Sequence, residues 1–143
     1  MPTRILPSRT PRPTATPQPT PRGTKAKLTA SLPASVPCVK SGTNCKWVYT
    51  VAFSETNCIA FTIERIRRRF VTVTGATYTV AGGDGWFNTT ISIKAYSTNG
   101  YYSSHTGQSS LYGQGSIIIN YTGHDEHGNA ISGEVRTIMA KED

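Results

Sequence analysis

The chain has 143 residues, enough for one domain and a terminal extension. Six of its 15 basic residues and none of its eight acidic ones lie in residues 1–27, so this segment carries six of the seven net positive charges. The remainder is nearly neutral, which weakens the case for nucleic-acid binding through a basic domain face, and we expect no nucleic-acid partner. No apolar run is long enough for a signal peptide or a membrane span. We therefore expect no membrane insertion, and any export signal would lie upstream of Met1.

Residues 1–27 are rich in Pro and Thr and hold almost no large apolar side chains. Such a segment cannot bury enough surface to offset its ordering entropy, and its prolines favour an extended conformation. We predict a linker or tail over 1–27 and a folded domain over 28–143. The tail is interpreted either as a plain disordered leader or as a spacer between modules of a secreted protein. Its charge would also allow weak, salt-sensitive contact with an anionic envelope polymer or membrane surface.

From residue 27 onward, apolar and polar side chains alternate in short runs, which is the pattern of β-strands. The clearest run is 46–54, where every second residue from Trp47 to Phe53 is large and apolar. The other predicted strands are 27–32, 59–63, one or two strands within 69–80, 89–96 with Ile91, Ile93 and Ala95 inward, 115–122, and 131–139. About seven such strands separated by Gly, Asn and Ser turns predict an all-β fold, a single antiparallel β-sandwich.

Two stretches carry a resemblance to a known class of domain. The stretch "WVYTVAFSETNCIAFTI" has an aromatic strand ending in an F-x-E-T turn, and "IIINYTGHDEHGNAISGEVRTI" has a Y-x-G-x-D-x-x-G-N hairpin. Together they are similar to immunoglobulin-like (Ig-like) β-sandwich modules of secreted and cell-surface bacterial proteins, over roughly residues 28–140. The Cys…Trp…Cys core spacing of antibody domains is absent. The resemblance implies a non-catalytic spacer, adhesion or accessory domain.

The three cysteines, Cys38, Cys45 and Cys58, allow one disulfide. Cys45 and Cys58 flank the strand 46–54, which spans roughly 30 Å, whereas a disulfide needs Cα atoms within ~7 Å. Cys38 and Cys45 bracket the short turn "VKSGTN" and are the predicted pair. Cys58 is then a buried thiol or the site of an intermolecular bridge. Zinc has the least support, because there is no C-x-x-C motif.

The stretch "GHDEHGN" places His124, Asp125, Glu126 and His127 between two predicted strands. Gly and Asn supply the positive φ that tight turns need, and an Asp side chain accepts hydrogen bonds from turn N–H groups. We interpret the stretch as a hairpin turn without a bound metal. A weak calcium site using Asp125 and Glu126 and a zinc site using the histidines are the alternatives.

Catalytic signatures are absent from the sequence. No serine stands in a G-x-S-x-G motif, and His105 lies in a Ser-rich stretch that we expect to be irregular. Glu55 and Glu64 are interpreted as turn and surface residues. We expect neither enzymatic activity nor a cofactor.

The stretch "ERIRRRF" places Arg65, Arg67 and Arg69 on one face of a strand and Arg68 on the other face or at a bulge. The arginine row could bind an acidic polymer or a protein partner. The preferred alternative is a solvated edge strand whose charges prevent edge-to-edge association.

Residues 96–115 are predicted to form a long loop rich in Tyr, Ser, Gly and Asn, a composition used for recognition in antibody loops. Tyr101, Tyr102 and Tyr112, together with Trp86 in the Gly-rich segment 82–88, are the candidate binding residues for a glycan or a protein. The alternative is that 101–112 forms an extra edge hairpin with Trp86 capping the core.

These patterns favour a non-catalytic extracellular or cell-surface module that acts as a spacer, anchor or adhesion domain. One alternative is a glycan- or polymer-binding module that uses 96–115. Another is a subunit of a surface filament or sheath, self-associating through the tail or through edge strands.

Overall fold

The computed structural model describes residues 24–80 and 84–142. Most of the predicted tail, residues 1–23, lies outside this description. The described elements are β1 (Leu28–Ser31), β2 (Ser35–Val36), β3 (Cys38–Ser41), β4 (Asn44–Glu55), β5 (Phe61–Val71), β6 (Thr77–Thr79), β7 (Trp86–Ile93), β8 (Thr98–Gln108), the short helix α1 (Ser109–Tyr112), β9 (Ser116–Asp125) and β10 (Ala130–Met139). The all-β prediction is confirmed, with ten strands in place of about seven.

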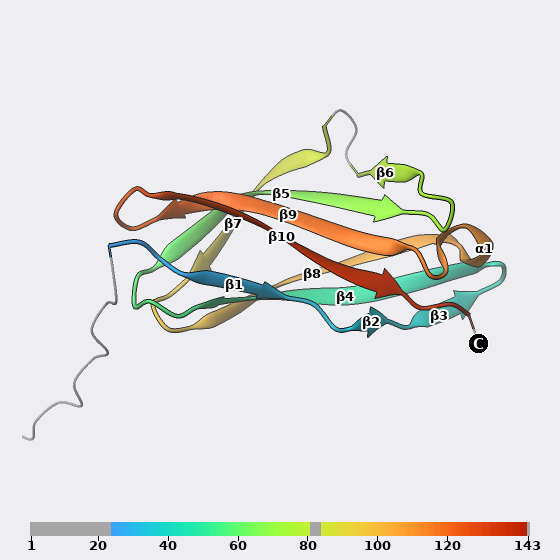
Figure 1. Cartoon of the computed structure of the whole chain (residues 1–143). Helices are drawn as coiled ribbons and strands as arrows, with labels where there is room; N and C mark the ends of the chain where they lie inside the picture. Colours follow the sequence, from blue (N-terminus) through green and yellow to red (C-terminus); the bar gives the residue numbers. More distant parts are fainter. Residues whose placement is uncertain (1–23, 81–83, 143) are drawn as a thin grey trace, which may run out of the picture.

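The strands form two sheets that enclose one core (Figure 1). In the four-stranded sheet, β1 and β3 pair with opposite ends of one side of β4, while β8 pairs along its other side. In the six-stranded sheet the order is β2-β10-β9-β5, and β7 and β6 both pair with the far side of β5. All pairings are antiparallel except that of β2 with β10, which is parallel.

Alternate residues of β4 point into the core, as their spacing predicted. Trp47, Val51 and Phe53 are fully buried, and Phe53 packs edge-on against Tyr121 of β9 in the opposite sheet. Ile91 and Ile93 are buried as expected, but the prediction for Ala95 is wrong. Ala95 is exposed because β7 ends at Ile93 and the chain turns there.

Two buried carboxylates organise the turns at the end of the molecule where the described chain begins. Glu55 is 2% exposed and accepts hydrogen bonds from the backbone N–H groups of Lys27, Asn57, Ile59 and Tyr96 at 2.8–3.3 Å. Burial opposes its ionisation, but these hydrogen bonds outweigh burial and lower the pKa of Glu55. Glu55 thereby ties the β4–β5 and β7–β8 connections to the start of β1.

Asp125 has the same role in the "GHDEHGN" hairpin between β9 and β10. Its carboxylate accepts hydrogen bonds from the backbone N–H groups of Ala26, His127 and Asn129, each at 2.9 Å. Gly128 takes a φ of +84°, which a tight turn requires there. The predicted hairpin turn is confirmed.

The predicted disulfide joins Cys38 and Cys45, whose Cα atoms are 5.1 Å apart across the β3–β4 hairpin. Cys58 is a free, half-buried cysteine in the β4–β5 connection. Both interpretations of Cys58, the inert thiol and the intermolecular bridge, stay predictions.

Candidate functional site

The arginine row lies on an internal strand. β5 pairs with β9 along its whole length on one side and with β7 and β6 on the other. The edge-strand interpretation of Arg65, Arg67 and Arg69 is therefore wrong, because a strand that is paired on both sides needs no charges to block further pairing. These arginines need another explanation.

Each of the three arginines has a defined partner on the outer surface of the six-stranded sheet. The guanidinium groups of Arg65 and Arg67 lie 5.3 and 5.0 Å from the ring centroid of Trp86 on β7. The side-chain oxygen of Asn120 on β9 accepts hydrogen bonds from Arg67 at 3.2 Å and from Arg69 at 2.9 Å. Cation–π and amide contacts of this kind hold long side chains in place without neutralising their charge.

We use the name arginine face for these residues together with their neighbours on β10: Arg65, Arg67, Arg69, Trp86, Asn120, Glu134 and Arg136. Glu134 is the carboxylate that pairs with these arginines among the described residues, at 2.6 Å from Arg136 and 3.5 Å from Arg69. Hydrogen bonds from Arg136 and Asn120 lower the pKa of Glu134, so it is ionised at neutral pH. Four guanidinium groups against the one carboxylate of Glu134 leave these seven residues with a net positive charge.

This geometry suits an extended anion. Alternate residues of a strand stand about 7 Å apart on one face, and the guanidinium groups of this row gather around Trp86 and Asn120. Guanidinium groups bind carboxylate, sulfate and phosphate through paired hydrogen bonds. The half-buried Trp86 ring lies against the guanidinium groups of Arg65 and Arg67 and holds them in place.

Arg68 points the other way, into the space between the sheets, as the strand periodicity predicted. Its guanidinium donates a 2.5 Å hydrogen bond to the hydroxyl of Ser103 on β8 and lies 5.4 Å from the ring centroid of Phe87. The irregularity in β5 falls between Ile63 and Arg65 and not at Arg68. Arg68 is therefore a structural residue of the core margin.

The four predicted binding residues are not brought together. Trp86 belongs to the arginine face, whereas Tyr101 points inward beside Phe87 with ring centroids 6.3 Å apart. Tyr112 is buried in α1 against His105. Tyr102 is 68% exposed on the outer surface of the four-stranded sheet.

The predicted loop 96–115 is wrong, because most of it is the regular strand β8. The alternative, an extra edge hairpin over 101–112, is correct in placing an edge strand here but wrong about the hairpin, because β8 pairs with β4 and is followed by the helical turn α1. His105 is correspondingly not in an irregular segment. Its ring stacks on Phe70 at a centroid distance of 3.9 Å and contacts Tyr112 at 4.4 Å.

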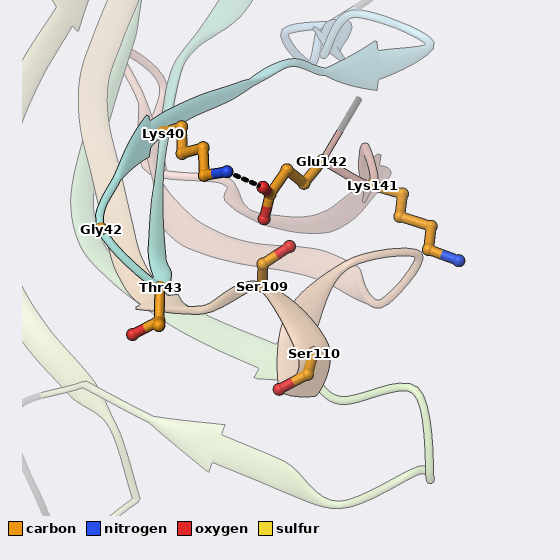
Figure 2. A pocket seen from close by; sticks show the side chains of 7 residues that line it. All are labelled: Lys40, Gly42, Thr43, Ser109, Ser110, Lys141 and Glu142. Carbon is orange, nitrogen blue, oxygen red and sulfur yellow. Dashed lines mark ion pairs between the residues drawn. The ribbon is translucent and has the colours of Figure 1, made fainter.

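A shallow hollow of about 510 Å³ lies at the end of the molecule where the β3–β4 turn, α1 and the C-terminal segment meet (Figure 2). Its lining consists of Lys40, Gly42, Thr43, Ser109, Ser110, Lys141 and Glu142. Lys40 and Glu142 form an ion pair across it, and the hydrogen bond from Lys40 lowers the pKa of Glu142. Because these charges neutralise each other, the hollow is a weaker candidate than the arginine face.

Within residues 24–80 and 84–142, no three His, Cys, Asp or Glu side chains gather as a metal-ligand set. His124 is held by Glu64, with 2.5 Å between its Nδ1 atom and the carboxylate. The described part of the chain also contains no helix long and apolar enough to cross a membrane.

The chain is similar in fold to two solved structures. One is the crystal structure of a Bordetella pertussis protein provisionally named ApaA, with 17% identity and a TM-score of 0.61, covering 87% of this chain and 100% of that chain. Another is the X-ray structure of a Northeast Structural Genomics Consortium target, with 14% identity and a TM-score of 0.55, covering 80% of this chain and 85% of that chain. No protein-family description and no curated protein matches the sequence. At these identities the similarity shows the fold alone.

Proposed function

We propose that this chain is a non-catalytic, secreted or cell-surface Ig-like module that works as an anchor or adhesion domain. It does so by holding an anionic polymer of an envelope or matrix on the arginine face. The observation that carries the proposal is the row of arginines on an internal strand, fixed by Trp86 and Asn120 and opposed by one carboxylate. Charge kept at this density on a solvent-facing sheet favours a negatively charged partner.

Three further features support the compartment and the module type. The Cys38–Cys45 disulfide is the kind of bond that persists in oxidising compartments. The first and last described residues lie at opposite ends of the molecule, as a domain strung between others requires (Figure 1). The Pro/Thr composition of residues 1–27 is that of a spacer.

The test is binding of the full-length chain to immobilised heparin and polyphosphate, with neutral dextran as the reference. In the face variant Arg65, Arg67 and Arg69 become Gln; in the control variant Lys46, Lys94 and Lys141 become Gln. Both variants lose three positive charges, and both keep the basic tail. We expect the face variant to bind at least ~10-fold more weakly, because it loses charge-assisted hydrogen bonds. Binding of the unmodified chain should weaken as salt is raised.

The proposal is wrong if the two variants weaken binding equally, since binding would then follow net charge and the tail. Equal retention on dextran would also contradict it. Circular dichroism of each variant checks that the sheets are intact.

A further inference from the structure

β8 is a long, regular strand with one side unpaired by any described residue. It pairs with β4 from Thr98 to Gln108 without a shift in register. On its other side, alternate backbone N–H and C=O groups therefore face outward along 11 residues. Such an edge is a template for another strand unless the sequence protects it.

The other sheet edges are protected. β1 and β3 have four residues each, β6 has three, and β2 has two. The pairing of β7 is interrupted by the irregularity between Ile63 and Arg65 of β5. The part of β10 that does not pair with β2 carries the charged residues Glu134 and Arg136. Short, bent and charged edges are the usual defences against unwanted pairing.

β8 has none of these defences. Its sequence, TNGYYSSHTGQ, contains no Lys, Arg, Asp, Glu or Pro. Its outward-facing side chains are small and polar, apart from Tyr102, which is 68% exposed. β7 is also uncharged, but it has eight residues and an interrupted register, so β8 is the longest regular neutral edge among the described strands.

We propose that β8 pairs antiparallel with β8 of a second copy of this chain, which joins two four-stranded sheets into one. Identical edges related by a two-fold axis are self-complementary in antiparallel pairing. With Ser103 on the axis, Tyr102 of each copy faces Ser104 of the other, which places a large ring over a small side chain on the outer surface. β8 itself brings no charged side chain to the contact.

The arginine faces do not oppose this pairing. They lie on the outer surface of the six-stranded sheet, whereas β8 belongs to the four-stranded sheet. Two copies can therefore join along β8 and keep both arginine faces open. Because the β8 edge is uncharged and self-complementary, a second copy of this chain is the partner that fits it best. This inference does not depend on the proposed polymer binding.

The experiment is sedimentation velocity of the full-length chain over a range of concentrations, with two matched variants. Ser104→Lys places a charge on the edge strand, beside the two-fold axis. Thr50→Lys places the same charge on the same outer surface, but on the central strand β4, directly opposite Tyr102. We expect the unmodified chain and Thr50→Lys to form reversible dimers and Ser104→Lys to stay monomeric. A non-reducing gel distinguishes this dimer from one linked through Cys58.

A chain that is monomeric at every concentration overturns the inference, and so does a dimer that Ser104→Lys leaves intact. Loss of the dimer in both variants would place the contact on the sheet surface and contradict edge pairing. Hydrogen exchange gives a second measurement that needs no variant. Amides within 98–108 should gain protection as concentration rises, while those of β10 should not.

Discussion

Asp125 shows how one buried side chain stabilises a turn and the start of the domain together. Its carboxylate binds three backbone N–H groups and the side-chain amide of Asn129 at 3.0 Å. Burial opposes ionisation, but these hydrogen bonds outweigh it and lower the pKa of Asp125 to about 2. A carboxyl group with a lowered folded-state pKa stabilises the fold above its unfolded-state pKa, and that stability is lost as the pH falls through the folded-state pKa.

The first prediction concerns Asp125→Asn. We expect the free energy of unfolding at pH 7 to fall by roughly 2 kcal/mol, because charge-assisted hydrogen bonds are lost. The variant should also lack the Asp125 part of the stability loss between about pH 4 and pH 2. Urea denaturation at pH 7 and pH 3 measures both effects. The control is Asp84→Asn, because Asp84 is exposed and its side chain accepts one hydrogen bond from the backbone N–H of Trp86. Equal losses in the two variants would contradict the role of Asp125.

His105 gives the second prediction. Burial, and then the charge of Arg68, lower the pKa of His105 to about 4. The unfolded chain therefore binds a proton at higher pH than the folded chain, and stability should decline as the pH falls from about 6.5 to 4 by on the order of 2 kcal/mol. His105→Phe keeps an aromatic ring in the stack and removes the titration. We expect its denaturation midpoint to change less than that of the unmodified chain over this range; an equal decline would contradict the assignment.

Among the strands, the sequence predicts the ones whose inward-facing side chains are aliphatic or aromatic. In these strands apolar and polar residues alternate clearly. The sequence does not predict β8, whose inner positions are Tyr101, Ser103, His105 and Gly107. Gly107 is needed there because a Cβ atom would lie 2.5 Å from the Tyr112 ring. An inner face made of polar side chains and a glycine does not follow the hydrophobic pattern, so the sequence predicts a loop where the structure has β8.

The arginine face is predictable only in part. The strand period places Arg65, Arg67 and Arg69 on one side and Arg68 on the other. The sequence does not reveal that β5 is internal, because which strands pair is decided by contacts between distant segments. Asn120 and Trp86 join the face through the register of β9 and β7 with β5. Nothing in the sequence around Asn120 or Trp86 indicates that these side chains lie beside the arginines.

The disulfide gives a prediction for a single hairpin. Cys38 and Cys45 close a short loop at the β3–β4 turn, and Trp47 beside it donates a hydrogen bond to the carbonyl of Ala140 at 3.0 Å. Replacing both cysteines by Ser should lower the free energy of unfolding by about 2 kcal/mol, the value for closing so short a loop. Denaturation of the double variant beside Cys58→Ser checks this. The prediction is wrong if Cys58→Ser costs as much.

For the whole molecule, the two outer surfaces differ in charge. The six-stranded sheet presents the arginine face, whereas the outer side of β4 and β8 carries small polar and apolar side chains and Tyr102, with Lys46 as its basic residue on these two strands. One surface therefore suits an anion and the other suits close approach of a neutral chain. A dimer formed along β8 would present two arginine faces to one polymer, which strengthens binding without new contacts.

The parallel pairing of β2 with β10 has a mechanical consequence. The described chain enters at one end of the molecule and leaves at the other (Figure 1), and Ser35 and Val36 lie beside Ile138 and Met139 in the same direction. A pull on the two ends would act first on β1, which pairs with β4, and then on β2. It would shear the hydrogen bonds between β2 and β10, with that from Ala140 to Val36, together. Bonds that must break together resist tension better than bonds that open one after another. A domain built in this way can transmit tension along its length while its sheets stay folded.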